Sequence, residues 1–125
     1  MSSVSHRKYP IITNSDVDAL EEIGQIDCSD IEILWIEVHN LVGGGTLTDF
    51  DIAFRTHGSG NFVTLYSATA DYTSPSGPLL GASADPATLV ADASALLQLN
   101  VRGIERIKIS AAGTNSSVSL YPRGA

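Results

Sequence analysis

Alternation of hydrophobic and polar residues is the dominant pattern of this chain. In the segment 49–55, Phe50, Ile52 and Phe54 occupy every second position, and the positions between them are mostly polar. A strand with one buried face has this period of two, whereas a helix would scatter the three apolar side chains. The segment 30–40 is apolar at most positions, which is typical of a central strand covered on both faces or of an edge used in association. We expect the two segments to be paired strands on which the rest of the chain packs.

Three consecutive glycines, Gly43 to Gly45, separate these two segments. Because glycine has no Cβ atom, such a run does not hold regular structure well, and we expect a wide and mobile hairpin loop. Phosphate-binding loops are also rich in glycine, but they require a helix after the loop and usually a lysine. Here a strand follows, so the sequence does not favour phosphate binding.

The same pattern predicts most of the remaining elements. Strands are expected at 19–26, 62–68, 95–101, 104–111 and 117–121, with a short extended piece at 78–81. The last two strands should form a hairpin around the turn at 112–116. Residues 86–92 fit either a helical start, with Asp85 as the cap and Pro86 as the first helical residue, or an extended path.

Together these elements number about eight strands, which is the usual number for two packed sheets. We therefore predict an all-β fold, a two-sheet antiparallel sandwich or jelly roll. Residues 1–15 are expected to be an extended N-terminal arm, and residues 16–125 a single β-sandwich domain. At 125 residues the chain is long enough to bury a core of its own.

Charge and cysteine content narrow the function. Seven basic residues against fourteen acidic ones give a net charge of −7, which repels nucleic acid. The single cysteine, Cys28, cannot form an internal disulfide, and we expect a buried small hydrophobic residue rather than a nucleophile. A signal peptide and a run of about eighteen apolar residues are both missing, so we expect a soluble protein made in the cytoplasm, with no membrane partner.

No group of residues has the spacing of a catalytic or cofactor site. His6, His39 and His57 do not match metal-ligand spacing, and surface or capping roles suit them better. Asp49 and Asp51 project from the same strand face and could hold Ca²⁺ if loop carbonyl groups contributed, but we favour outward acids on a solvated sheet face. We therefore expect no enzyme activity, no cofactor and no metal.

An interaction surface is the better-supported hypothesis. Basic residues of the N-terminal arm come just before a segment crowded with acids between residues 16 and 32, so the arm of one copy could reach the acidic segment of a neighbour. Trp35, the only tryptophan, is expected in the core; the alternatives are an anchor in a subunit contact or a stacking platform for a sugar. The candidate interface residues are His6, Arg7, Lys8, Tyr9, Pro10 and Trp35.

Several stretches resemble small β-sandwich virion proteins of tailed bacteriophages. They are IEVHN, TDFDIAFR, GNFVTL, VRGIERIKISAAG and VSLY, within residues 30 to 121. The resemblance implies a structural protein of the virion, made in the host cytoplasm. It implies a capsid decoration or cement protein that binds the major capsid protein or other virion subunits and forms a homo-oligomer, with a trimer favoured. A head-to-tail or tail component is the alternative within the same class.

A carbohydrate-binding, lectin-like module is the hypothesis from a different class. Such a module needs exposed aromatic side chains arranged as a platform, and aromatic residues make up only 6% of the chain. Burial of Trp35, Tyr66 and Tyr72 would count against it.

Overall fold

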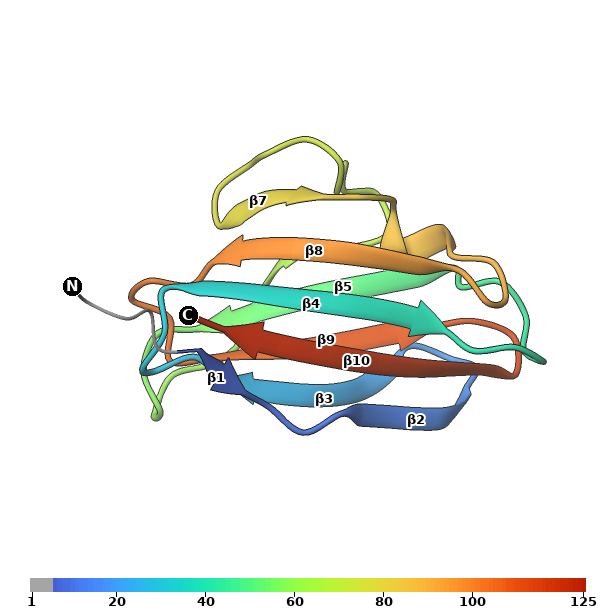
Figure 1. Ribbon diagram of the computed structural model, residues 1–125, viewed down its shortest axis with the longest axis horizontal. Coiled ribbons are helices and arrows are strands. Elements are labelled where there is room, and N and C mark those ends of the chain that lie inside the picture. Colours follow the sequence, from blue (N-terminus) through green and yellow to red (C-terminus); the bar gives the residue numbers. More distant parts are fainter. Residues whose placement is uncertain (1–5) are drawn as a thin grey trace.

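The computed structural model describes residues 6–125, which form ten strands and one short turn of 3-10 helix, η1 (Figure 1). The elements are β1 (Arg7–Lys8), β2 (Ile12–Val17), β3 (Glu21–Asp27), β4 (Ile33–Asn40), β5 (Asp49–Arg55), β6 (Val63–Tyr66), β7 (Leu79–Ala82), η1 (Pro86–Thr88), β8 (Ser94–Asn100), β9 (Arg106–Ala112) and β10 (Ser116–Gly124). Within the described residues, no helix is long and apolar enough to span a membrane.

Two antiparallel sheets pack against each other. The six-stranded sheet has the order β1-β10-β4-β8-β7, with β2 also paired to β10, and the four-stranded sheet has the order β3-β9-β5-β6. The connections β2–β3, β4–β5 and β9–β10 each carry the chain from one sheet to the other, which is the arrangement of a jelly roll. The predicted all-β, two-sheet antiparallel sandwich is therefore confirmed. The strand count exceeds eight because the N-terminal segment adds β1 and β2, and the boundary expected at residue 15 falls inside β2.

Two expected strand pairings are wrong. β4 and β5 do not pair: β4 lies between β10 and β8 in one sheet, and β5 lies between β9 and β6 in the other. The last two strands, β9 and β10, are likewise in different sheets rather than in a hairpin. Alternation fixes which side chains face inward, but it is the same for two hairpin partners and for two strands that face each other across a core.

The glycine-rich loop after β4 packs closely against the β9–β10 turn. The expectation of a wide hairpin loop is therefore wrong. The Gly45 amide donates to the Thr114 carbonyl oxygen at 2.8 Å. A Cβ atom on Gly44 would lie 2.7 Å from the Asn115 carbonyl oxygen, and one on Gly45 would lie 2.6 Å from that of Thr114. These glycines therefore allow two backbones to touch at the place where the chain changes sheet.

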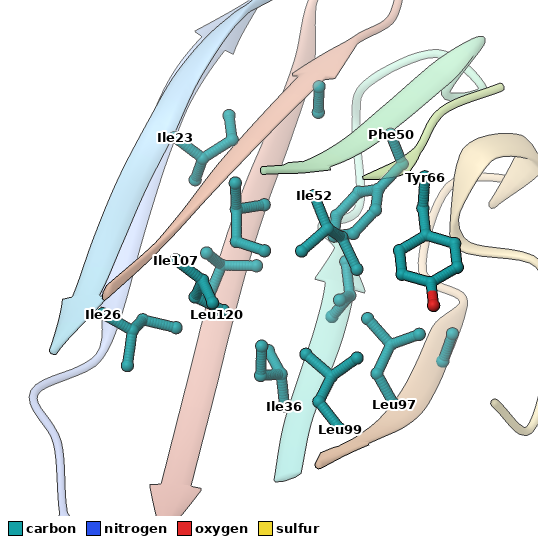
Figure 2. Close-up of a cluster of buried hydrophobic side chains, with 14 of the residues drawn as sticks. Ile23, Ile26, Ile36, Phe50, Ile52, Tyr66, Leu97, Leu99, Ile107 and Leu120 are labelled. Carbon is teal, nitrogen blue, oxygen red and sulfur yellow. The ribbon is translucent and has the colours of Figure 1, made fainter. Parts of the chain in front are cut away.

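The core lies between the two sheets (Figure 2). Every second side chain of the central strands is fully buried: Leu34, Ile36 and Val38 from β4, Phe50 and Ile52 from β5, Leu97 and Leu99 from β8, Ile107 and Ile109 from β9, and Val118 and Leu120 from β10. Tyr66 and Tyr72 are also buried, and each hydroxyl donates to a backbone carbonyl, that of Ser76 and Phe50 respectively. Their polar tips are therefore satisfied inside an apolar core.

Residues 86–92, which the sequence left open, begin with the turn η1. The Asp85 carboxylate accepts a hydrogen bond from the Ala87 amide at 2.9 Å, and Pro86 follows the cap. The helical start is therefore real but ends after one turn, and β8 begins at Ser94.

Replacing Leu97 with alanine should lower the free energy of unfolding by about 2–5 kcal/mol, because Leu97 is fully buried between the sheets. Leu96→Ala is the matched control on the same strand: Leu96 is 49% exposed, and its replacement should cost no more than about 0.5 kcal/mol. Urea unfolding of both variants measures the difference. Equal losses would mean that β8 does not present alternate residues to the core.

Candidate interaction surface

One row of side chains crosses the outer face of the six-stranded sheet. The register pairs Lys8 of β1 with Arg123 of β10. Arg123 in turn pairs with Trp35 of β4, and Trp35 pairs with Gln98 of β8. Register partners in a sheet point to the same side. Since Leu34 beside Trp35 is buried in the core, the whole row faces outward.

Trp35 is half-buried on this outer face, so its expected place in the core is wrong. The segment 30–40 is apolar on both sides, and its inner positions are filled by Leu34, Ile36 and Val38. The opposite sheet covers only one face of β4. The Trp35 indole therefore lies on the other, uncovered face of the sheet, where it is the largest apolar side chain.

The next row of the same face adds two exposed apolar side chains. Tyr121 of β10 and Leu96 of β8 both pair with Glu37 of β4, and they are 37% and 49% exposed. Both lie diagonally from Trp35, at a distance that large side chains can bridge. We call Trp35, Leu96, Tyr121 and Arg123 the aromatic face. Trp, Tyr and Arg are the residue types that most often dominate the energy of protein interfaces.

Sequence reasoning identified Lys8 and Trp35, and it considered Tyr121 as an alternative anchor in a subunit contact or platform for sugar stacking. It missed Leu96 and Arg123. The signal was partly there, because alternation along the strands expected at 95–101 and 117–121 places Leu96 and Tyr121 opposite to the core positions. What was missing is the register that brings three distant strands side by side.

The basic residues of the arm are held within their own chain. Arg7 Nη1 lies 2.5 Å from Asp30 Oδ1, and Arg7 Nη2 lies 3.5 Å from Asp27 Oδ2. The guanidinium also stacks on the Tyr9 ring, and the Tyr9 hydroxyl donates to the Asp27 carbonyl oxygen at 2.6 Å. Burial raises the pKa of Tyr9 to about 12. The arm therefore contacts the acidic segment of its own chain. The expected contact with the acidic segment of a neighbouring copy stays a prediction.

The remaining arm residues of the predicted interface, His6, Lys8 and Pro10, are exposed to solvent. Lys8 is the one that the register aligns with Trp35, through Arg123. His6 and Pro10 flank this position on the same edge of the sheet.

Cys28 is buried, as predicted, and lines a pocket of about 250 Å³. Burial raises the pKa of its thiol to about 12, so the thiol stays protonated at neutral pH. Glu105 at the rim is 2.6 Å from Arg55 and 3.3 Å from Arg106, which engage its carboxylate. The pocket is lined by Cys28, Ser29, Ile31, Thr56, Gly103, Ile104 and Glu105.

The histidines do not come together in the part of the chain that the structure describes. His39 lies at the end of β4, 2.6 Å from the Ser94 hydroxyl and 3.4 Å from Asp92. His57 follows β5 at the opposite end of the sandwich. Among residues 6–125, no three His, Cys, Asp or Glu side chains are grouped so that they could hold a metal ion.

Asp49 and Asp51 project from one face of β5, as the sequence predicted, but they are less solvated than expected. Each is half-buried, and its Oδ1 atom is buried without a hydrogen-bond partner in the described structure. Burial, followed by the adjacent Asp49 carboxyl, raises the pKa of Asp51 to about 6. The two carboxyl groups form a pair that disfavours double ionisation.

The Asp51→Asn variant should be more stable than the wild type above pH 6. The pKa of an unfolded aspartate is about 3.9, so Asp51 holds its proton more tightly in the folded state than in the unfolded state. The folded state therefore loses stability as the pH rises from about 4 to about 6 and this proton is released. Asparagine resembles the protonated acid, so the melting temperature should rise by about 2–5 °C at pH 7 and stay unchanged at pH 4. Exposed Asp16→Asn controls for the loss of one charge. An equal shift in melting temperature at both pH values would contradict a raised pKa of Asp51 in the folded state.

Comparison with known proteins identifies the fold. No family model matches the chain, and no curated protein matches it. Among solved structures, the crystal structure of SPBc2 prophage-derived protein YomS superposes on 99% of this chain and 97% of that chain, with a TM-score of 0.57 and 8% sequence identity. The likeness shows that the two chains share one jelly-roll-like sandwich fold along almost their whole length.

Proposed function

We propose that this chain is a non-enzymatic structural protein of a phage virion, and that it decorates the capsid by bridging neighbouring capsid subunits. Two lines support a phage protein. The stretches quoted above resemble small virion proteins of tailed bacteriophages, and the fold is shared with a prophage-derived protein. The partner is the major capsid protein, and the place of action is the virion.

The aromatic face is the observation that carries this proposal. It presents Trp35, Tyr121 and Arg123 on the flat outer side of a six-stranded sheet, where a capsid subunit could lie against it. An aromatic side chain buries about 150–250 Å² when it is covered, so two such residues supply much of the apolar contact of a small interface. Arg123 adds a cation that orients the partner's acidic groups.

The folded chain offers no exposed thiol for a disulfide to the capsid, because its single cysteine is buried, so the association is proposed to be noncovalent. Many weak contacts repeated over a capsid lattice can still hold firmly, since each bound copy raises the effective concentration of the next contact. A homo-oligomer, which the resemblance implies as a trimer, would place several aromatic faces on neighbouring subunits at once.

A carbohydrate-binding module is the second candidate, and one observation favours it. Trp35 and Tyr121 lie diagonally on one flat face, as a sugar-stacking platform requires. Tyr66 and Tyr72, by contrast, are buried with their hydroxyls engaged, so they cannot contribute. A tail or head-to-tail component would use the same face on a different virion partner.

Deleting the gene from the phage should give particles that assemble but lose their DNA at a lower temperature than the wild type. Adding purified protein to these particles should restore the melting temperature of the capsid, measured by release of dye-accessible DNA. Trp35→Ala/Tyr121→Ala should bind at least tenfold more weakly in a particle co-sedimentation assay, because it removes both aromatic anchors.

The matched control is Val63→Ala/Leu65→Ala, which removes exposed apolar side chains from β6 in the other sheet. It should bind like the wild type. Protein that is absent from purified virions, or particles that are equally heat-resistant without it, would overturn the capsid role. Binding of the wild type, but not of the Trp35→Ala/Tyr121→Ala variant, on a glycan array would favour the carbohydrate module instead.

A further inference from the structure

The strands run along the long axis of the sandwich, so their ends gather at its two ends (Figure 1). Charged residues are divided between these two ends. One half collects the ends of β1, β3, β5, β8 and β10 and the beginnings of β4 and β9. All seven Lys and Arg residues of the chain lie in this half, which we call the cationic end. They are Arg7, Lys8, Arg55, Arg102, Arg106, Lys108 and Arg123.

Only four of the fourteen acidic residues accompany these cations: Asp27, Asp30, Glu32 and Glu105. Each of the four lies within 4 Å of an arginine, but the contact between Glu32 and Arg102 is long, at 3.8 Å, and both side chains are largely exposed. In the described part of the chain, Lys8, Lys108 and Arg123 have no carboxylate at ion-pair distance. The cationic end thus has positive charge to spare in a chain whose net charge is −7.

The opposite half, which we call the acidic end, has no lysine or arginine. All the other acidic residues lie there, apart from Asp71 in the loop before β7. Asp16 and Glu22 are exposed, and the orphaned Oδ1 atoms of Asp49 and Asp51 belong to the same half. Of these acids only Asp92 has an ion-pair partner among residues 6–125, namely His39.

Exposed apolar side chains also occur on the loops of the acidic end. Three of the exposed large hydrophobic residues stand on the loops of the acidic end: Leu20 between β2 and β3, Val42 between β4 and β5, and Val90 before β8. Val42 is the most exposed of them, at 73%. The cationic end instead holds the pocket of about 250 Å³, whose apolar lining is Cys28, Ile31 and Ile104. The exposed apolar side chains of the acidic end and the pocket of the cationic end therefore lie at opposite ends of the sandwich.

We propose that copies of this chain associate head to tail, with the acidic end of one copy docked on the cationic end of the next. An apolar tip of the acidic end, Val42, enters the pocket beside Cys28, while exposed acids approach Lys8 and Arg102. The complementary surfaces lie at opposite ends of one chain, so they cannot meet within a single molecule. Two copies related by a two-fold axis through either end would place like charges together.

The size and chemistry of the two ends fit such a contact. A standard interface takes about 800 Å² from each partner, whereas one copy exposes 6337 Å², so two end contacts would use only about a quarter of the surface. Exposed ion pairs contribute at most about 1 kcal/mol each, so the charges mainly orient the copies and the buried tip supplies affinity. A head-to-tail contact closes into a ring, such as a trimer, or continues as a chain. The contact uses Lys8, Arg102 and the pocket and needs neither Trp35 nor Tyr121, so the inference does not depend on the virion role.

Analytical ultracentrifugation of the purified protein tests the proposal without any capsid. Wild type should be oligomeric at 100 μM in 50 mM salt, and the dissociation constant should weaken at least tenfold in 500 mM salt, because exposed charges are screened. Lys8→Glu/Arg102→Glu and Asp16→Lys/Glu22→Lys should each be monomeric under the low-salt condition. An equimolar mixture of these two variants should associate again, since the reversed ends are complementary to each other.

Two further variants test the apolar contact of Val42 with the pocket independently of the charged contacts. Val42→Ser removes the tip, and Thr56→Trp fills the pocket from its exposed rim; each should weaken self-association at least tenfold without changing any charge. Leu65→Glu adds a negative charge to β6 opposite the middle of β5, between the two ends, and should associate like the wild type. Thermal melting of each variant verifies that it is folded. A wild type that stays monomeric in low salt, or a mixture of reversed variants that fails to associate, would overturn the proposal.

Discussion

Contact between the inner faces of the two sheets is the interaction on which the rest of this structure depends. Alternate side chains from β4, β8 and β10 meet those from β5 and β9, and nearly all of them are completely removed from water. Because the strand period is two, burying one set of residues sends every neighbour outward. The aromatic face is thus a direct consequence of the core: once Leu34 and Ile36 face inward, Trp35 has to stand on the opposite side.

How far the sequence predicts this fold follows from the same period. Alternation correctly placed Phe50 and Ile52 inside, Asp49 and Asp51 outside, and a strand over β8, because each of these conclusions is local. It did not reveal that β4 and β5 face each other across the core, since sheet membership depends on contacts between distant segments. The short connections between these strands resembled hairpin loops, and only their packing against one another in space distinguishes a crossover from a hairpin.

The candidate surfaces were less accessible to sequence reasoning. Lys8 and Trp35 could each be proposed as interface residues, but their alignment requires β10, whose C-terminal half lies between them. The polarity of the molecule is hidden in a similar way. Acids crowd the segment from 16 to 32, whereas the bases are spread along the sequence from Arg7 to Arg123. The bases come together only because the ends of β5, β8 and β10 lie at the same end of the folded chain. Charge plotted along the sequence therefore suggests only a basic arm, whereas the folded chain has a cationic end and an acidic end.

The close seating of Gly44 and Gly45 against the β9–β10 turn has a practical consequence. In the printed sequence this triple glycine resembles a flexible spacer, the kind of place where an epitope or fluorophore is usually grafted. Here the backbone is wedged beneath Thr114 and Asn115, with no room for even one extra carbon atom on either glycine. A graft at that point would separate the β4–β5 and β9–β10 connections, so reporter groups belong instead on the exposed residues 73–75 of the β6–β7 connection, beyond its buried Tyr72.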